Sequence, residues 1–381
     1  MLDMDRAREV FDASTDFTVG IEEEFALLDP HTHDLTQRFE DLRDAAQGDP
    51  LLEEGIAGEL IASEIEIRSG RGADLAEAAA RQQEMRAALF RLAAERGVLL
   101  GSTGTHPWSP WDEQRIIDTE HYRRVEEGLG YVARRNNSFS VHVHVGVRGA
   151  DRAIDVCDRL RPVLPELLAL SANSPFLDGH VAGLHSSRSQ IFTRSFPRCG
   201  IPDPLGDWTR YAEYVDLLVA TGSVVEPTQL WWSVRPHHAF GTVEVRICDA
   251  QSTAEEAGAL CALMVSCVAQ AALDHDQGVP HEPPAHRLIE ENLWRAIRYG
   301  LDGELIDLGS RATFPALAVP DRLLDWTAPA RAQLGIEPAL SSENGSQRQR
   351  RRIEEGATIR EVFALEVAAT QASYGGAEVR S

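Results

Sequence analysis

The chain has 381 residues, enough for one large enzyme domain or two smaller ones, and its 60 acidic and 37 basic residues give a formal net charge of −23. This acidic excess disfavours non-specific nucleic-acid binding, which needs Lys and Arg to neutralise phosphates. All 37 basic residues are Arg, and the lack of Lys excludes a Walker-A phosphate loop, a Schiff-base lysine and the Lys–Glu pair of protein kinases.

Predicted strands fall mainly in the first 250 residues. Alternating or buried apolar patterns predict strands at residues 17–28, 60–67, 98–103 and 138–147, and a hairpin of residues 229–235 and 242–248. Helices are predicted at residues 74–96 and 152–172, and the chain is mostly helical from residue 253. Residues 175–204 are rich in Gly, Ser and Pro and predict a long irregular segment of the kind that often covers an active site.

This order of elements predicts the fold class. Strands that precede a run of helices favour an α+β fold with a largely antiparallel sheet over a regularly alternating parallel one. No composition shift marks a domain boundary.

The cysteines and the apolar segments predict a cytoplasmic protein. Five Cys residues with no C-x-x-C pair indicate neither a disulfide framework nor a zinc knuckle. The first residues are charged and have no apolar signal core. Residues 257–273 are uncharged, but Ser266, Gln270 and several Ala favour a buried helix over a membrane span.

Two strands carry carboxylates on one face. In residues 20–25, Glu22 and Glu24 project to the same side, about 7 Å apart by strand geometry. In residues 63–68, Glu64, Glu66 and Arg68 share a face opposite two isoleucines. Each pattern alone is also typical of a solvated edge strand. The apolar residues that flank Glu22 instead suggest a strand built into a core.

Histidines and a carboxylate–guanidinium pair repeat this one-sided pattern on two later strands. His142 and His144 share one face opposite three valines, and Glu244 and Arg246 share a face of a strand that follows Arg235. Half-buried histidines and a cross-strand ion pair are the alternative readings. If all these strands join one sheet, they form one polar wall, and clustered carboxylates with imidazole favour Mg²⁺ or Mn²⁺.

An ordered set of motifs resembles the type 2 glutamate–cysteine ligase family, also called carboxylate–amine ligases. The motifs are GIEEEF at 20–25, the strand of Glu66, GTHP at 104–107, HVHVG at 142–146, SSR at 186–188, and W-x-x-RP…FGTVEVR-x-x-D at 232–249. The resemblance implies a fold similar to those of glutamine synthetase and the guanidino kinases. It also implies one catalytic domain over residues 14–372, with 1–13 and 373–381 as terminal tails.

The resemblance implies an ATP-dependent ligase. ATP would phosphorylate a carboxylate, such as the γ-carboxylate of L-glutamate, and an amine such as L-cysteine would displace phosphate to form an amide. Mg²⁺ or Mn²⁺ would be held by Glu22, Glu24, Glu66, His142 and Glu244. Arg246, Arg235 and Arg188 would be catalytic and bind phosphate or carboxylate, and His144 would contact the nucleotide or its phosphates. We expect these small molecules as partners, no nucleic acid or membrane, and allow for a homodimer.

Three other functions are compatible with this sequence. A phosphagen-kinase-like phosphotransferase would share the fold but release a phosphorylated product. A metal-dependent hydrolase built on H-x-H would work without ATP. A non-catalytic small-molecule binder of the same fold has no reason to keep so many mutually repelling carboxylates. Ser233 and residues 136–139 depart from the usual family sequence, at sites that bear on the amine acceptor.

Overall fold

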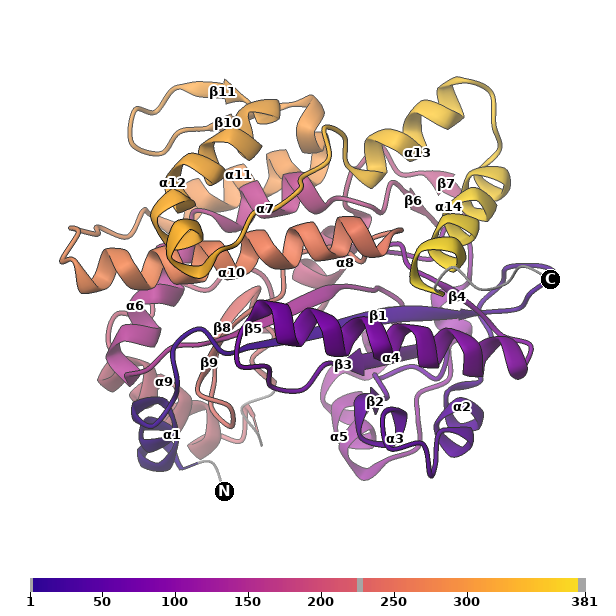
Figure 1. The fold of residues 1–381 in the computed structure, drawn as a ribbon, viewed down its shortest axis with the longest axis horizontal. Coiled ribbons are helices and arrows are strands. Elements are labelled where there is room, and N and C mark those ends of the chain that lie inside the picture. The colour runs from indigo at the N-terminus through magenta and orange to yellow at the C-terminus, as the bar shows by residue number, and fades with distance from the viewer. Residues whose placement is uncertain (1–2, 225–228, 376–381) are drawn as a thin grey trace.

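The computed structural model of the protein describes residues 3–224 and 229–375 (Figure 1). Its main feature is one seven-stranded sheet with every pairing antiparallel. The strands of this sheet are β1 (Val19–Leu28), β2 (Ile56–Ala57), β3 (Glu64–Arg68), β4 (Leu99–Gly101), β5 (Val141–Gly146), β8 (Val234–His237) and β9 (Thr242–Val245). Two small hairpins are β6 (Phe176–Leu177) with β7 (His180–Val181), and β10 (Glu304–Ile306) with β11 (Thr313–Pro315).

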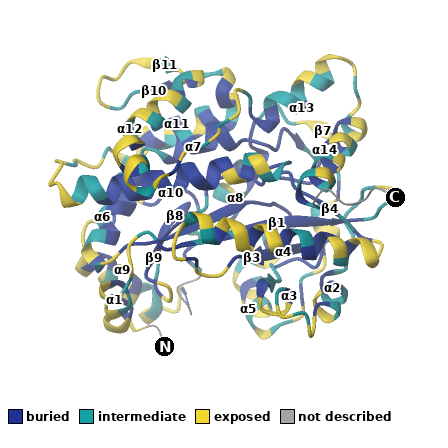
Figure 2. Ribbon diagram, viewed as in Figure 1, coloured by how far each residue is buried: buried dark blue, intermediate teal, exposed yellow. Residues whose placement is uncertain are grey.

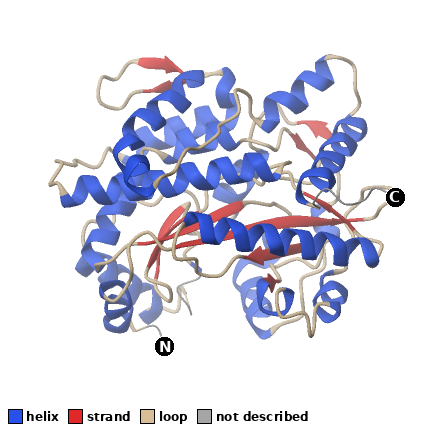
Figure 3. Ribbon diagram, in the orientation of Figure 1, coloured by secondary structure: helices blue, strands red, loops and turns tan. Residues whose placement is uncertain are grey.

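Helices surround the sheet and form most of the C-terminal third of the chain (Figure 3). They are α1 (Met4–Asp12), α2 (Phe39–Ala45), α3 (Leu52–Gly55), α4 (Leu75–Glu95), α5 (Glu120–Leu129), α6 (Ala150–Leu160), α7 (Leu164–Ser171), α8 (Ser187–Ser195), α9 (Trp208–Ala220), α10 (Ala254–Asp276), α11 (His286–Tyr299), α12 (Val319–Leu334), α13 (Gly345–Glu354) and α14 (Ile359–Tyr374). The predicted α+β class with a largely antiparallel sheet is confirmed.

The sheet order places the long strand β1 at the centre. The order is β2-β3-β1-β5-β9-β8, and β4 pairs with the far end of β1. Four of these strands are the ones whose polar residues alternate with apolar ones. Because side chains alternate between faces along each strand, the antiparallel register gathers these polar residues on one face of the sheet.

The opposite face of the sheet is the main hydrophobic core. The valines of β5 and β9 are buried there, and α4, α6 and α10 pack against this side. Figure 2 shows α10 as buried along most of its length. Among the described helices, α10 alone is long and apolar enough to span a membrane, yet 83% of its apolar window is buried inside the protein. The prediction of a buried core helix over residues 257–273 is therefore confirmed.

Local sequence signals explain where the best-predicted helix begins and ends. The Asp74 side chain caps α4 by accepting a hydrogen bond from the Glu77 backbone N–H at 2.9 Å. Gly97 follows the helix with a φ of +66°, a conformation that favours glycine. The observed helix thus confirms the predicted one at residues 74–96 to within one residue at each end.

Several predicted elements are wrong in their extent. The predicted helix at 152–172 is two helices, α6 and α7, because Pro162 and Pro165 interrupt its hydrogen bonding. Residues 229–233 of the predicted hairpin are not paired with β9; Trp232 bridges to Gly200 instead. The segment 175–204 is not irregular throughout, because it contains β6, β7 and α8.

The predicted terminal tails also need correction. Residues 4–12 form α1, and Phe11 is fully buried in the main core, so this segment belongs to the folded unit. At the other end, Tyr374 is buried between Phe25 and Phe90, with ring centroids 5.2 and 5.7 Å away. Residues 376–381 lie outside the described part of the chain.

Candidate active site

The polar face of the sheet is built from directly opposed residues on neighbouring strands. Glu24 of β1 pairs with Glu66 of β3, and Glu22 of β1 pairs with His142 of β5. On the far side of β5, His144 pairs with Glu244. These cross-strand positions bring titratable groups within a few ångströms of one another.

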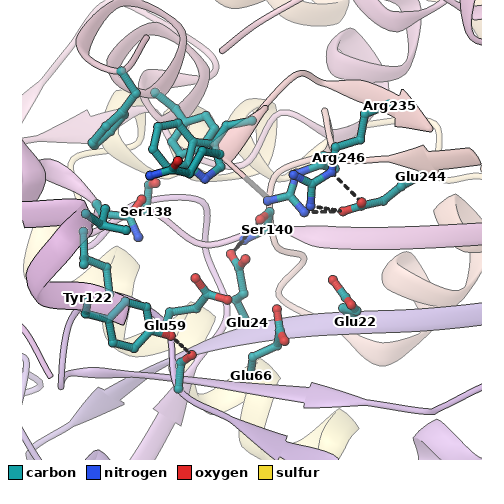
Figure 4. A pocket seen from close by; sticks show the side chains of 18 of the residues that line it. Glu22, Glu24, Glu59, Glu66, Tyr122, Ser138, Ser140, Arg235, Glu244 and Arg246 are labelled. Carbon is teal, nitrogen blue, oxygen red and sulfur yellow. Dashed lines mark hydrogen bonds and ion pairs between the residues drawn. The ribbon is translucent and has the colours of Figure 1, made fainter. Parts of the chain in front are cut away.

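This face forms the floor of a cavity of about 410 Å³. Eight of the nine residues predicted for the site line the cavity: Glu22, Glu24, Glu66, His144, Arg188, Arg235, Glu244 and Arg246. Figure 4 shows the carboxylates of Glu24, Glu59 and Glu66 directed toward one another at its centre. Tyr122 and Ser138 lie on one side of them, and Arg235, Glu244 and Arg246 lie on the other.

The ninth predicted residue, His142, lies just behind the cavity wall. Its Nε2 is 2.7 Å from Ser140 Oγ, which donates a hydrogen bond to Glu24. On the other side of the ring, Nδ1 lies 3.2 Å from a carboxylate oxygen of Glu22 and 3.4 Å from Nη1 of Arg246. Burial, with the charge of Arg246, lowers the pKa of His142 to about 3, so the ring is neutral.

His144 offers a nitrogen to a second group of acidic side chains. Its Nε2 is buried and makes no hydrogen bond, and it lies 3.2 Å from Glu22 and 3.8 Å from Glu244. The other ring nitrogen is 3.0 Å from the hydroxyl of Thr242, which orients the ring. Burial alone would lower the pKa of His144, but the charges of Glu244 and Glu22 raise it. A cation and a proton would therefore compete for Nε2.

A third group joins Glu24, Glu59 and Glu66, whose carboxylate oxygens lie within 4.8 Å of one another. Burial and the charge of Glu66 raise the pKa of Glu24 to about 7, and burial and the charge of Glu24 do the same for Glu59. Burial and the charge of Glu22 raise the pKa of Glu66 well above its usual range. Crowding of this kind penalises ionisation unless cations are present.

The donor atoms of these groups fit divalent cations that prefer oxygen. The three groups are Glu22–Glu66–His142, Glu22–His144–Glu244 and Glu24–Glu59–Glu66. Carboxylate oxygens with at most one imidazole nitrogen suit Mg²⁺ or Mn²⁺ better than Zn²⁺ or copper. The Nε2 of His144, which lies 3.2 Å from the carboxylate of Glu22 and 3.8 Å from that of Glu244, is the atom that most directly indicates a cation here.

Two arginines hold the fully buried Glu244. Arg235 donates to it through Nε at 2.7 Å and through Nη2 at 3.3 Å, and Arg246 donates to its Oε1. Burial alone would raise the pKa of Glu244, but these guanidinium charges keep it well below its usual range. The Nε of Arg246 is buried and has no hydrogen-bond partner among the described residues, and the Arg246 side chain lines the cavity.

Arg188 is held in place by the backbone that follows β9. Its guanidinium donates to the carbonyls of Arg246 and Ile247, at 3.2 and 3.1 Å, and lies 3.6 Å from the buried Asp249. Asp249 explains Gly104 of the GTHP motif, because a Cβ at Gly104 would lie 2.7 Å from the carboxylate of Asp249. Asp249 also accepts a hydrogen bond from Ser186, the N-cap of α8, at 2.9 Å.

Beyond Glu59 the cavity is bounded by apolar and aromatic side chains. They are Leu60, Tyr122, Val125, Leu129, Phe192, Phe196 and Trp231. Leu60 and Val125 anchor a small hydrophobic cluster, against which Tyr122, Leu129 and Trp231 pack while partly exposed. This apolar end contrasts with the charged centre and indicates a subsite for a part of a substrate with little charge.

Reasoning from the sequence missed Glu59 and this apolar end. Glu59 lies in the loop before β3, where a single Glu carries no periodic signal, and only the folding of that loop over the sheet brings it to Glu24. Glu23, by contrast, faces away from the site as strand alternation predicts. It accepts hydrogen bonds from Arg86 and Gln82 of α4 on the opposite face, at 2.6 and 2.8 Å.

Sequence comparisons find closely similar bacterial proteins. The family model for glutamate–cysteine ligase family 2 matches residues 18–363. A protein of Rubrobacter xylanophilus is 40% identical over 348 residues, covering 89% of this chain and 93% of its own. One of Sorangium cellulosum is 39% identical over 340 residues, covering 89% of each chain. One of Solibacter usitatus is 36% identical over 365 residues, covering 94% of each. All three are provisionally named as glutamate–cysteine ligases of type 2.

Structural comparisons identify the fold. The glutamate–cysteine ligase of Francisella tularensis, solved in complex with AMP, superposes with a TM-score of 0.69 at 11% identity and covers 96% of this chain and 91% of its own. A bifunctional glutathione synthetase from Pasteurella multocida gives a TM-score of 0.65 at 14% identity, covering 97% of this chain and 54% of its own. The fold is therefore that of the glutamate–cysteine ligases, as the sequence motifs predict.

Proposed function

The chain belongs to glutamate–cysteine ligase family 2, and from this we propose that it is an ATP-dependent ligase that joins the γ-carboxylate of L-glutamate to an amine. One observation carries the proposal. Three groups of metal-ligating side chains, linked because Glu22 and Glu66 each belong to two of them, lie over one sheet face, and the guanidiniums of Arg235 and Arg246 lie beside them. Phosphoryl transfer between two anions needs this combination of oxygen ligands and fixed positive charge.

In the first step a γ-carboxylate oxygen attacks the γ-phosphorus of ATP, and the bond to the ADP oxygen breaks. Arg246 is placed to stabilise the charge on the transferring phosphoryl group, because its side chain lines the cavity and its guanidinium binds Glu244 beside the metal-ligating groups. Arg235 holds Glu244 and supports Arg246 through that shared carboxylate. We assign Arg188, fixed by two backbone carbonyls, to an anionic group of the nucleotide or of glutamate.

In the second step the amine attacks the acyl carbon, loses a proton, and displaces phosphate to form the amide. Mg²⁺ or Mn²⁺, held by Glu22, Glu24, Glu66, His142 and Glu244 with Glu59 added, would neutralise phosphate charge. The walls of the cavity would keep water from the acyl phosphate.

The acceptor amine is assigned to the space that glutamate and the triphosphate leave free in the cavity. The charged centre suits glutamate and the triphosphate, so the apolar end beyond Glu59 is the space left for the acceptor. L-Cysteine is the acceptor that the family implies. Trp231, Phe192 and Leu129 in this end also favour larger apolar amines, because their partly exposed side chains would gain by being covered.

Trapping with hydroxylamine tests the proposal. The enzyme is incubated with ATP, Mg²⁺, L-glutamate and hydroxylamine, a small amine that makes no use of the apolar end, and glutamyl hydroxamate and ADP are measured. A second set replaces hydroxylamine with L-cysteine, L-alanine, L-leucine and L-phenylalanine, and product mass is read.

The outcomes separate the candidate functions. Equimolar ADP, phosphate and amide are expected. A stable phosphorylated product without phosphate release would indicate a phosphotransferase. Substrate hydrolysis without ATP would indicate a hydrolase, and ATP binding without any turnover would indicate a binder. Each of these three results would overturn the proposal. The cytoplasmic location, the homodimer and the assignment of catalysis to a single domain stay predictions.

A further inference from the structure

Two aromatic side chains form a flat surface at one edge of the active-site cavity. His237 is the last residue of β8, and Phe240 lies in the turn that leads to β9. Their rings stack with centroids 4.3 Å apart and planes 12° apart, and both line the cavity. We refer to His237 and Phe240 as the aromatic ledge.

The aromatic ledge is presented to solvent by a constrained turn. Phe240 is 61% exposed, the second most exposed of the large hydrophobic side chains in the described residues. The turn closes through a hydrogen bond from the Gly241 N–H to the carbonyl of His237 at 3.0 Å. Gly241 has a φ of +62°, and its carbonyl accepts a hydrogen bond from Ser14 at 2.8 Å. The turn is therefore anchored, and the exposed ring is held in a defined place.

The aromatic ledge adjoins one of the three metal-ligating groups. The ring of His144 meets both ledge rings edge-on, with its centroid 5.1 Å from that of His237 and 5.7 Å from that of Phe240. The Nε2 of the same His144 faces Glu22 and Glu244. A single ligand that carries both phosphates and an aromatic ring could therefore bind a cation at this group and stack its ring on the aromatic ledge.

From this arrangement we propose that the aromatic ledge is the nucleobase subsite, where Phe240 stacks on the adenine of ATP. The inference rests on the proposed function, because it requires a nucleotide to be a substrate. A stacked aromatic face binds a purine through its π-surface, and the metal-ligating groups beside it account for the triphosphate. The apolar end of the cavity is a weaker candidate, because it lies across Glu24, Glu59 and Glu66 from Glu244.

His237 adds a polar contact to this subsite. Its Nδ1 is buried and has no hydrogen-bond partner among the described residues. A buried polar atom without a partner is costly, so a ligand hydroxyl or ring nitrogen that reaches it gains affinity. A nucleoside carries such groups on both its ribose and its base. We therefore assign His237 Nδ1 to a contact with the nucleoside part of ATP.

The test compares a ligand that carries a nucleobase with a ligand that has only the phosphates. Dissociation constants of Mg–ATP and Mg–tripolyphosphate are measured by calorimetry for the wild type, Phe240→Ala and Phe240→Trp. Removing one base-stacking aromatic side chain weakens binding by about 5- to 150-fold. We expect this loss in Phe240→Ala for Mg–ATP only, a change below about 2-fold for Mg–tripolyphosphate, and recovery of Mg–ATP binding in Phe240→Trp. Tyr131→Ala, which removes another exposed aromatic ring outside the cavity lining, is the control and should bind both ligands normally.

The possible results distinguish the two proposals. If the wild type binds Mg–ATP and Phe240→Ala binds it equally well, the nucleobase subsite is wrong while the proposed function stands. If Phe240→Ala weakens both ligands alike, the ring supports the phosphate site and the subsite is again wrong. If the wild type binds no Mg–ATP, the proposed function fails and the subsite fails with it. Melting curves of the variants check that they are folded, as expected for a residue exposed in a turn.

Discussion

Replacing Arg246 by Lys separates a catalytic role of this guanidinium from a purely structural one. Lys keeps the positive charge but loses the planar, two-pronged donor group of Arg. In the structure Arg246 donates to Glu244 through one terminal nitrogen, and its buried Nε has no partner. A lysine ammonium can replace the first contact but cannot also occupy the position of Nε.

The structure limits how much stability the substitution can cost. Glu244 keeps both hydrogen bonds from Arg235, at 2.7 and 3.3 Å, so its buried charge stays paired. A Lys at 246 can restore one charged hydrogen bond at a longer reach. We therefore expect Arg246→Lys to lower the free energy of unfolding by about 1 to 2 kcal/mol. This is less than the cost of losing a charged hydrogen bond and leaving its partner buried and unpaired.

The expected effect on turnover is much larger. An arginine that stabilises a transferring phosphoryl group contributes on the order of 10³-fold or more to kcat, and we expect Arg246→Lys to lower kcat at least about 100-fold. Turnover is measured as ADP released with glutamate and hydroxylamine, and stability as Tm in the same preparation. Arg210→Lys, on an arginine whose side chain is 77% exposed, is the matched control and should change neither.

One combination of results would refute the reasoning. A Tm lowered by a few degrees together with near-normal kcat would mean that Arg246 only neutralises Glu244, and it would remove Arg246 from the catalytic residues. Loss of kcat by at least about 100-fold, with a Tm lowered by no more than a few degrees, is the expected pattern.

Three further predictions follow from the structure. Mg²⁺ or Mn²⁺ should raise the Tm of the wild type in proportion to RT ln(1 + [L]/Kd), and Glu66→Gln should show a smaller rise in a metal titration; equal shifts would contradict the metal assignment. Burial raises the pKa of Glu166 to about 7, so as pH rises from 4.5 through 7 the wild type should lose up to about 3 kcal/mol more unfolding free energy than Glu166→Gln. Denaturant titrations of both proteins at pH 5 and 8 give these free energies, and an equal loss in the two proteins would contradict the prediction. Trp231→Ala should lower kcat/KM for apolar amines about 10-fold, as one aromatic contact can, and leave hydroxamate formation unchanged; an equal fall with hydroxylamine would place Trp231 elsewhere.

The sequence by itself predicted which face of each strand carries the chemistry. Alternation with period two is a local property, so Glu22 and Glu24 had to share a side, and Glu23 had to face the other way toward the helices. The start of a helix that depends on a capping side chain, such as Asp74 before α4, is also determined by neighbouring residues in the sequence. The ordered motifs then identified the family, although no single motif was specific.

The tertiary structure alone decided which strands are neighbours and what the loops bring to the sheet. Glu59 completes a group with Glu24 and Glu66 because a loop folds back over β3, and no periodic signal marks it. The aromatic ledge exists because the turn of Phe240 is anchored beside His144, on a strand about 95 residues earlier. Such contacts depend on the sum of packing over distant segments, whereas strand periodicity depends only on the geometry of adjacent residues. For that reason the sequence could supply the side chains of the candidate site, and only the packed sheet could assemble them.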